Sequence, residues 1–297
     1  MSDYLLQQLA NGLILGSMYA LVAIGFSMIY GIVRLINFAH GDIAMIGAFT
    51  ALAALMAADL PIIVVVLAVL LVGAAVGLAI EAVAFRPLRG APQVNGFITS
   101  LAVSVLIQNT GILVLTAEPR SVAFPAFLSQ PIAGLPITVD LVDVLIVVLA
   151  IVLMAALGAI VNRTRLGMAM RATAENLDVA RLMGINVNRA IMAAFAIGSA
   201  LAGMAGLMWG ARYGQIDPMM GFLPGLKAFV AAVIGGVGSI PGAMLGGYLL
   251  GLAEVLFVGL LPPEYAGFRD AFVFGTLILV LLVLPNGLLG RAAEDRA

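Results

Sequence analysis

The sequence predicts an all-α protein, a polytopic transmembrane helical bundle of eight or nine spans with broken or re-entrant helices. Hydrophobic residues make up 63% of its 297 residues and charged residues only 10%. Several apolar runs reach the roughly 20 residues that cross a bilayer core about 30 Å thick. These runs are continuous rather than alternating, which argues against a β-barrel. We therefore expect a single transmembrane domain over residues 1–297, without a soluble domain.

The apolar runs can be followed along the chain, each bounded by polar, Gly-rich or Pro-rich residues. They cover residues 5–30, 43–58, 61–85, 97–117, 141–161, 190–210, 223–234, 243–261 and 268–289. A loop rich in proline separates the fourth run from the fifth. The run 223–234 is short, and whether it crosses or re-enters decides between nine spans and eight. The first residues lack a basic stretch, so we expect no cleavable signal peptide.

The distribution of basic residues predicts the orientation. Nine of the 14 basic residues fall in three segments, namely Arg86 and Arg89, then Arg163, Arg165, Arg171, Arg181 and Arg189, and finally Arg291 and Arg296. All three segments share one side if the run 223–234 crosses. The positive-inside rule then favours nine spans, an external N-terminus and a cytoplasmic C-terminus.

Two stretches interrupt apolar runs with residues that break helices. The first places Asn37, His40, Gly41 and Asp42 within six residues, and the second contains Gly235, Gly236 and Gly238. Polar groups at membrane depth usually face the bundle interior, and paired helix breaks often mark a transport site. We therefore predict that both stretches line a translocation path. The alternative is structural, with Asn37 and Asp42 capping a helix break and His40 a satisfied buried group.

The sequence has few residues of the kinds that carry catalysis or bind metals. The chain has no cysteine and one histidine, so we expect no metal site and no cofactor. It has neither a Gly-x-Ser-x-Gly elbow nor a nucleotide-binding loop. We therefore expect that it is not an enzyme and that any ATP hydrolysis takes place on another chain. A net charge of −1 argues against nucleic-acid binding. Glu254 lies within a span and is best explained as a paired interhelical group. The small residues of 199–210 indicate close helix packing.

The most polar stretch, residues 171–189, reads RATAENLDVARLMGINVNR. It predicts one short amphipathic helix, with Thr173 as its N-cap and Gly184 as its left-handed C-terminal residue. Leu177, Ala180 and Met183 form its apolar stripe. Two interpretations remain open. The helix lies on lipid headgroups, or it docks on a soluble partner.

Three motifs together resemble one family. RATAENLDVARLMGINVNR is similar to the cytoplasmic coupling loop of ABC-importer permeases, here about residues 162–189. NFAHGDIAMIGAF at 37–49 and GGVGSIPGAMLGG at 235–247 resemble signature stretches of the Liv-type permeases for branched-chain amino acids. The resemblance covers nearly the whole chain. The residues that match the ATPase-docking loop are Ala174, Glu175, Asn176, Ala180, Gly184 and Ile185, and Thr173, Leu177, Arg181 and Met183 complete the predicted docking helix.

The resemblance implies a permease subunit in the bacterial inner membrane, importing Leu, Ile or Val with energy from ATP hydrolysis in partner subunits. The implied partners are a second homologous permease, two cytoplasmic ATPases and a periplasmic substrate-binding protein, all in contact with or near membrane lipid. Since the family also serves urea and short amides, an importer of those substrates is the alternative. A stand-alone secondary carrier is a further one, but Glu254 is its only clear mid-membrane acidic candidate.

Overall fold

The structure is a computed structural model that describes residues 2–57, 60–134 and 136–290. Its α-helices are α1 Ser2–Val33, α2 His40–Ala57, α3 Ile62–Ile80, α4 Gln93–Leu115, α5 Leu141–Arg163, α6 Arg165–Glu175, α7 Leu177–Leu182, α8 Val187–Tyr213, α9 Phe222–Gly235, α10 Ile240–Leu260 and α11 Arg269–Val283. Shorter turns of π or 3₁₀ helix are η1 Glu81–Phe85, η2 Arg86–Leu88, η3 Ala126–Ser129 and η4 Pro263–Phe268. The strands β1 Arg120–Ser121 and β2 Gln215–Ile216 form one antiparallel pair.

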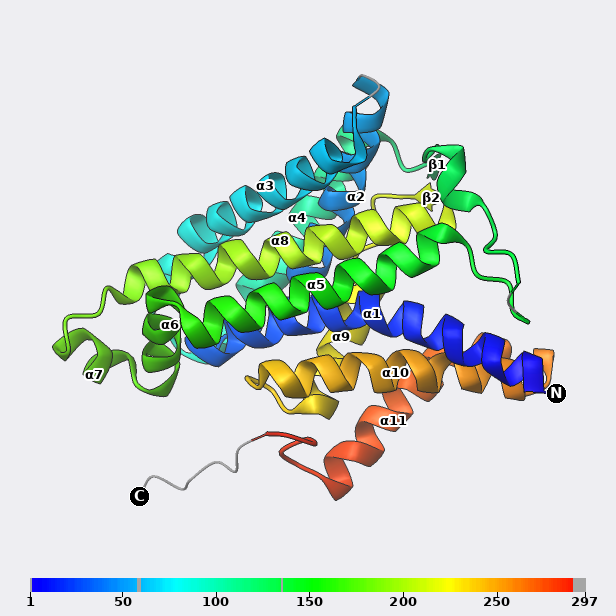
Figure 1. The fold of residues 1–297 in the computed structure, drawn as a ribbon. Coiled ribbons are helices and arrows are strands. Elements are labelled where there is room, and N and C mark those ends of the chain that lie inside the picture. The colour runs from blue at the N-terminus through cyan, green and yellow to red at the C-terminus, as the bar shows by residue number, and fades with distance from the viewer. Residues whose placement is uncertain (1, 58–59, 135, 291–297) are drawn as a thin grey trace.

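The predicted helical bundle is confirmed. Among the described residues, eight helices are long and apolar enough to cross a membrane. The ninth apolar helix, α9, has 14 residues, which span about 21 Å at 1.5 Å per residue and fall short of a bilayer core of about 30 Å. Figure 1 shows α1, α5 and α8 side by side, with α6 and α7 at the end opposite the N-terminal end of α1.

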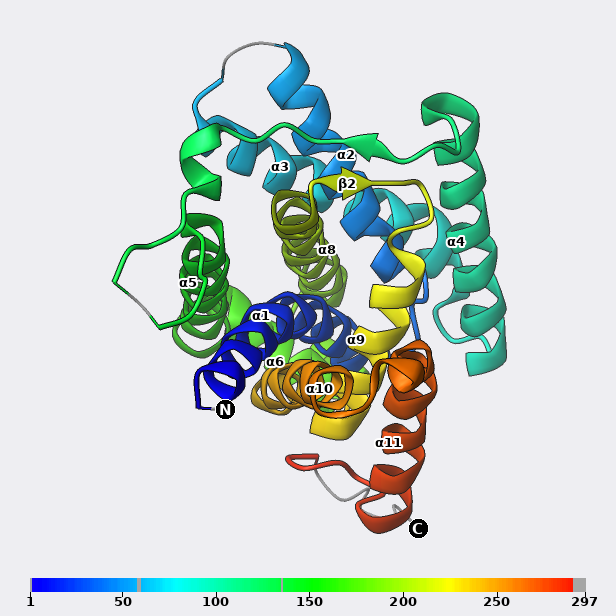
Figure 2. The same cartoon turned by 90° about the vertical axis from the view of Figure 1, so that its right-hand side faces the viewer.

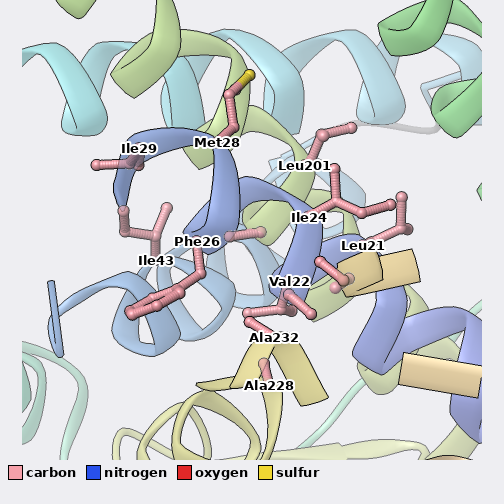
Figure 3. Packing of buried hydrophobic residues seen from close by; sticks show 14 of the residues in the cluster. Leu21, Val22, Ile24, Phe26, Met28, Ile29, Ile43, Leu201, Ala228 and Ala232 are labelled. Atoms are coloured by element: carbon pink, nitrogen blue, oxygen red, sulfur yellow. The ribbon is translucent and has the colours of Figure 1, made fainter. Parts of the chain in front are cut away.

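Helix α1 forms the centre of the bundle. It contacts α5, α8, α9 and α10, and in the end view of Figure 2 these helices surround it. Its side chains interlock with those of its neighbours, as Leu21 and Phe26 do near Leu201 of α8 and Ala228 of α9 (Figure 3). Ala228 is fully buried, and its small size lets the short helix α9 lie close to α1.

The outer helices expose large apolar side chains. Val83 in η1, Leu113 in α4 and Leu282 in α11 are 78%, 85% and 76% exposed. Apolar surface on this scale is costly in water but suits a hydrocarbon environment. The chain is therefore a multi-pass membrane protein, with α3, α4, α5 and α11 supplying much of the lipid-facing surface.

Helices α2 and α8 approach each other at small residues. A Cβ added at Gly47 would collide with the backbone of Gly203, and one added at Gly206 would collide with the backbone of Ala44. Only residues without a large side chain allow this approach. The packing role predicted for the small residues of 199–210 is confirmed.

The loops at the N-terminal end of α1 are tied to one another. Strand β1, after α4, pairs with β2, after α8, through Arg120 opposite Ile216. The Gln7 amide donates to the Thr138 carbonyl at 3.0 Å and accepts from the Thr138 N–H at 2.8 Å. These bonds fix the proline-rich loop over this end of the bundle.

Candidate functional site

The first predicted break lies between α1 and α2. Helix α1 ends at Val33, Arg34 has a left-handed backbone (φ 58°), and α2 begins at His40. Asn37 is 2% exposed and His40 is 1% exposed. Within the described part of the chain, the Asn37 amide has no hydrogen-bond partner, whereas the His40 ring lies beside the Val22 carbonyl. Asn37 therefore makes no side-chain capping bond, as the structural alternative would require, whereas His40 is a buried group beside the Val22 carbonyl, as that alternative predicts.

The carboxylate of Asp42 accepts hydrogen bonds from side chains of α4, a contact that the sequence pattern did not predict. Ser104 of α4 donates a hydrogen bond to one carboxylate oxygen, and Gln108 donates to the other at 2.9 Å. Gln108 also donates to Ser104 at 3.1 Å. Asp42 thus joins α2 to α4 through a buried polar cluster and does not cap α2. The signal was present in the sequence, because Ser100, Ser104 and Gln108 recur every four residues in an otherwise apolar run.

The second break lies between α9 and α10. Gly235 ends α9, and Gly236 and Gly238 take positive φ values of 108° and 87°, which glycine adopts without strain. The Gly238 N–H donates to the Ser27 hydroxyl of α1 at 2.9 Å. The Leu289 N–H donates to the Gly235 carbonyl at 2.9 Å. The break therefore lets the segment after α11 pack against the end of α9.

The two breaks approach each other at the C-terminal end of α1, where Gly238 lies against Gly31, shortly before Arg34. Gly41, beside the first break, lies against Gly221 and Gly225 at the start of α9, whereas Gly235 ends the same helix. The length of α9, about 21 Å at 1.5 Å per residue, separates Gly41 from Gly235. They do share α1 as a neighbour, since His40 lies edge-on to Phe26.

The predicted single helix after Thr173 is wrong, because the polar stretch forms two helices. Thr164 caps α6 by accepting from the Gly167 N–H, and Asn176 caps α7 by accepting from the N–H groups of Asp178 and Val179. Thr173 lies inside α6, where it is buried and its hydroxyl donates to the Ala169 carbonyl. The true start of the second helix is therefore three residues later than predicted.

The predicted C-terminal end at Gly184 is confirmed. Gly184 has φ 79°, its N–H donates to the Arg181 carbonyl, and the Ile185 N–H donates to the Ala180 carbonyl, both at 3.0 Å. This pair of bonds is a Schellman motif. Arg181 also pairs with Asp178 at 3.1 Å on the exposed surface, a contact worth little to stability.

The apolar stripe of α7 divides into two faces. Ala180 is 3% exposed, and Leu177, Ala174 and Ile185 are half-buried against the core. Met183, predicted to share the stripe, is 76% exposed and turns away from them. The outward apolar face consists of Val179, Leu182 and Met183, which are 53%, 86% and 76% exposed. Glu175 ends α6 just before it. The exposed apolar surface of the segment is therefore this outward face rather than the predicted stripe.

The α6–α7 segment is held against the bundle by several contacts. Helix α6 touches α1, α5 and α8, and the Arg171 side chain donates to the Val161 carbonyl of α5. Arg89 after η2 bonds both Asn188 of α8 and Glu81 of η1. Glu81 thus pairs with Arg89. A movement of this segment therefore bears directly on several membrane helices.

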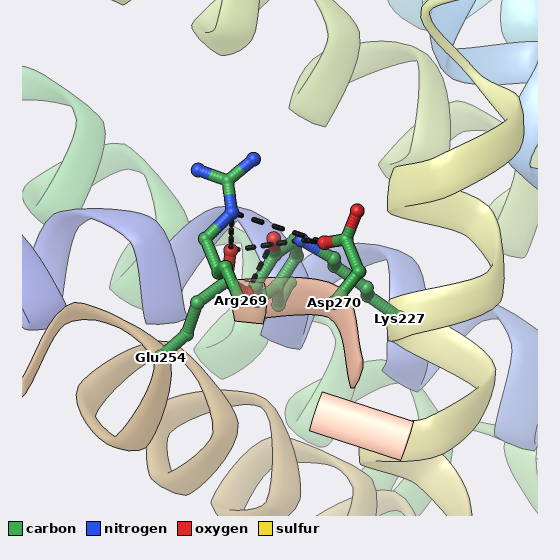
Figure 4. A network of polar contacts seen from close by, with 5 residues as sticks. Lys227, Glu254, Arg269 and Asp270 are labelled. Carbon is green, nitrogen blue, oxygen red and sulfur yellow. Dashed lines mark hydrogen bonds and ion pairs between the residues drawn. The ribbon is translucent and has the colours of Figure 1, made fainter. Parts of the chain in front are cut away.

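An ion cluster lies among α9, α10 and α11 (Figure 4). Glu254 of α10, 2% exposed, accepts from Lys227 of α9 at 2.8 Å and pairs with Arg269 of α11 at 3.1 Å. Lys227 also pairs with Asp270 at 2.7 Å, and Tyr19 of α1 donates to Glu254 at 3.0 Å. Two carboxylates meet two cations, which is what buried charges require. The predicted pairing of Glu254 is confirmed. The sequence pattern did not identify its partner Lys227, which is the single lysine of the chain.

Comparisons with known proteins agree with this architecture. The family model described as branched-chain amino acid transport system / permease component matches residues 8–282. The chain is 43% identical to the high-affinity branched-chain amino acid transport system permease protein BraD of Pseudomonas aeruginosa, over 98% of this chain and 97% of that one. It is 44% identical to the corresponding permease protein LivH of Escherichia coli K12, over 99% and 98%.

A more distant similarity covers about half of the chain. The autoinducer 2 import system permease protein LsrC of Klebsiella pneumoniae is 32% identical over 47% of this chain and 42% of its own. No solved structure matches the chain.

Proposed function

Because the chain belongs to the family of permease components of branched-chain amino acid transport systems, we propose that it is a membrane subunit of an ATP-driven importer of leucine, isoleucine and valine. The family consists of transport components rather than enzymes, so the chemistry of ATP hydrolysis belongs to other subunits. We place the complex in the bacterial inner membrane. Its other members are a second homologous permease, two cytoplasmic ATPases and a periplasmic substrate-binding protein.

The observation that supports ATP-driven transport most strongly is the outward face of α7. Val179, Leu182 and Met183 are exposed on a helix that is capped at both ends and fixed to the bundle. Exposed apolar side chains such as these contribute a stabilising free energy only when another surface covers them. An ATPase cleft is the partner we assign to them, and Arg163, Arg165 and Arg189 nearby favour the cytoplasmic side.

The contacts of α6 suggest how the force is transmitted. Closure of two ATPases on ATP would displace α7 and, through the short link at Asn176, α6. Helix α6 contacts α1, α5 and α8, so these three helices would move with it. The binding protein supplies affinity for the amino acid, and the permease alternates between outward and inward access.

The buried polar groups around Asn37, His40 and Asp42 are assigned to the translocation path, together with the glycines at 235, 236 and 238. Among the described residues, no group pairs with the buried amide of Asn37. Unsatisfied buried groups cost roughly 1–3 kcal/mol each. A path that exchanges them for water or substrate in another conformation would explain why they are retained.

The test is reconstitution of the permease with the ATPases and binding protein that co-purify with it. We expect uptake of radiolabelled leucine into proteoliposomes that requires ATP and the binding protein. Competition by isoleucine and valine, and the lack of competition by urea or acetamide, would distinguish the proposed substrates from the alternative. Uptake that persists without ATP and follows an ion gradient would overturn the proposal in favour of a secondary carrier.

A further inference from the structure

A cavity of about 380 Å³ opens between α1, α8, α10 and α11. It lies beside the N-terminal half of α1 and the C-terminal half of α10, at the end of the bundle opposite α6 and α7 (Figures 1 and 2). Its volume falls within the range of about 300–1,000 Å³ that is typical of small-molecule sites. Neither the predicted translocation residues nor the docking segment lines it.

One wall carries the guanidinium of Arg269, which is held by ion pairs through Nε while its terminal nitrogens face elsewhere. Arg269 is 52% exposed, and the structure records its ion pairs through Nε, to Glu254 at 3.1 Å and to Asp270 at 3.8 Å. Figure 4 shows its two terminal nitrogens pointing away from both carboxylates. A guanidinium fork of this kind binds a carboxylate through two parallel hydrogen bonds.

The rest of the wall has the other features of an amino acid site. The amide side chains of Gln8 and Asn11 line the cavity and offer oxygen acceptors to an ammonium group, beside the carboxylate of Glu254. Val255 and Val258 of α10 supply an aliphatic surface.

The ion pairs behind the cavity wall keep the charged lining residues partly neutralised. The two carboxylates of Glu254 and Asp270 offset the two cations of Lys227 and Arg269. Arg212, at the edge of the cavity, is offset by Asp143 at 3.0 Å. The charged groups that line the cavity itself are Arg212, Arg269 and Glu254, so a ligand there meets cations and a carboxylate and can carry a charge of each sign.

We propose that this cavity binds a free aliphatic amino acid as its zwitterion, with the carboxylate on the fork of Arg269, the ammonium near Gln8 and Asn11, and the side chain against Val255 and Val258. The assignment rests on the proposed function, because it makes the cavity the site at which the importer receives its substrate. If α6 and α7 are cytoplasmic, the cavity opens on the opposite, extracytoplasmic side.

The absence of cysteine from the sequence provides a direct test. Val258→Cys places the single thiol in the cavity, where Val258 is 37% exposed, and the purified full-length protein in lipid nanodiscs is labelled with a maleimide. Leucine at saturating millimolar concentration should slow labelling at least fivefold. Leucinamide, which lacks the carboxylate, and 4-methylpentanoate, which lacks the ammonium, should not protect.

Two variants complete the test. Ser129→Cys, on an exposed residue of η3 at the same end of the molecule, is the matched control and should label at the same rate with or without leucine. Arg269→Lys in the Val258→Cys protein keeps the charge but removes the fork, and should raise the half-protecting leucine concentration about tenfold. The analogue series needs no change at Arg269, so it stands even if that variant folds poorly.

The outcomes separate this inference from the proposed function. Equal protection by leucine and by both analogues, or no protection by leucine, overturns the amino acid site even if the complex imports leucine normally. Failure of the wild-type complex to import leucine overturns the proposed function and is measured separately, in proteoliposomes. Protection of Val258→Cys that depends on both charged ends of leucine supports the site.

Discussion

Leu182→Asp is expected to uncouple the transporter without unfolding the permease. Leu182 is 86% exposed on α7, so the chain itself loses almost no packing when the side chain changes. Exposed substitutions of this kind usually shift stability by no more than about 0.5 kcal/mol. Any large effect must therefore come from a surface that covers Leu182 in the complex.

The magnitude follows from burial. Covering one leucine side chain contributes about 1.5–3 kcal/mol, and each ~1.4 kcal/mol is a tenfold change in affinity. Leu182→Ala should therefore weaken docking of the ATPase by roughly 10- to 100-fold. Leu182→Asp should weaken it further, because a carboxylate would have to be buried without a partner.

The assay combines co-purification of the ATPases with ATP hydrolysis stimulated by the binding protein in proteoliposomes. Leu182→Met is the matched control, since it keeps the apolar volume and such swaps usually cost less than about 1.5 kcal/mol. Leu177→Ala is the contrasting variant. Leu177 packs against the permease's own core, so this change should lower the thermal stability of the permease itself.

One result would refute the reasoning. If Leu182→Asp retained full ATPase co-purification and full coupled uptake, the outward face of α7 would not be covered by an ATPase. The segment would then be an interfacial strut on lipid headgroups, the other interpretation of its sequence.

Three further predictions concern other parts of the molecule. Asn188→Cys, at an exposed position after α7, should react with an impermeant maleimide only from the cytoplasmic side, and labelling of intact cells from outside would reverse the orientation. Asn37→Leu should leave thermal stability unchanged or higher, because the amide makes no hydrogen bond within the described residues, while reducing uptake; unchanged uptake would remove Asn37 from the path. Gly184→Val should destabilise the α7 turn by about 1–2 kcal/mol because φ is positive, whereas Gly184→Asn should be tolerated, as limited proteolysis of the loop would reveal; equal cleavage of the two variants would contradict this.

The membrane helices could be predicted because each depends on local composition. Runs of apolar residues, and breaks at glycine or at Arg34–Asp42, mark the helices within a few residues. The ends of α6 and α7 could not be predicted equally well. Thr164, Thr173 and Asn176 all have side chains that can cap a helix, and only packing selects among them. Thr173 is buried inside α6, which the local pattern does not reveal.

Contacts between distant segments lay beyond the sequence pattern. Lys227 occurs in a short apolar run, and its partners Glu254 and Asp270 lie on two later helices. Nothing local indicates that these three side chains meet. Likewise the spacing of Leu177, Ala180 and Met183 predicts an apolar stripe but not which members the protein's own core covers. The three-dimensional arrangement turns Met183 outward and packs the half-buried Leu177 against the core.

The two ends of the bundle are linked by the same helices. At one end α6 contacts α1 and α8, and at the other end α1 supplies Gln8 and Asn11 and α8 supplies Arg212 to the cavity. Helix α1 has 32 residues, or about 48 Å at 1.5 Å per residue, so it reaches from one end to the other. A helix packed this tightly on both sides moves as a unit rather than bending locally. Displacement of α6 by a docked ATPase would therefore reach the cavity through α1, and α10 would follow α1 because the two helices meet closely at Gly12, Gly16 and Gly251.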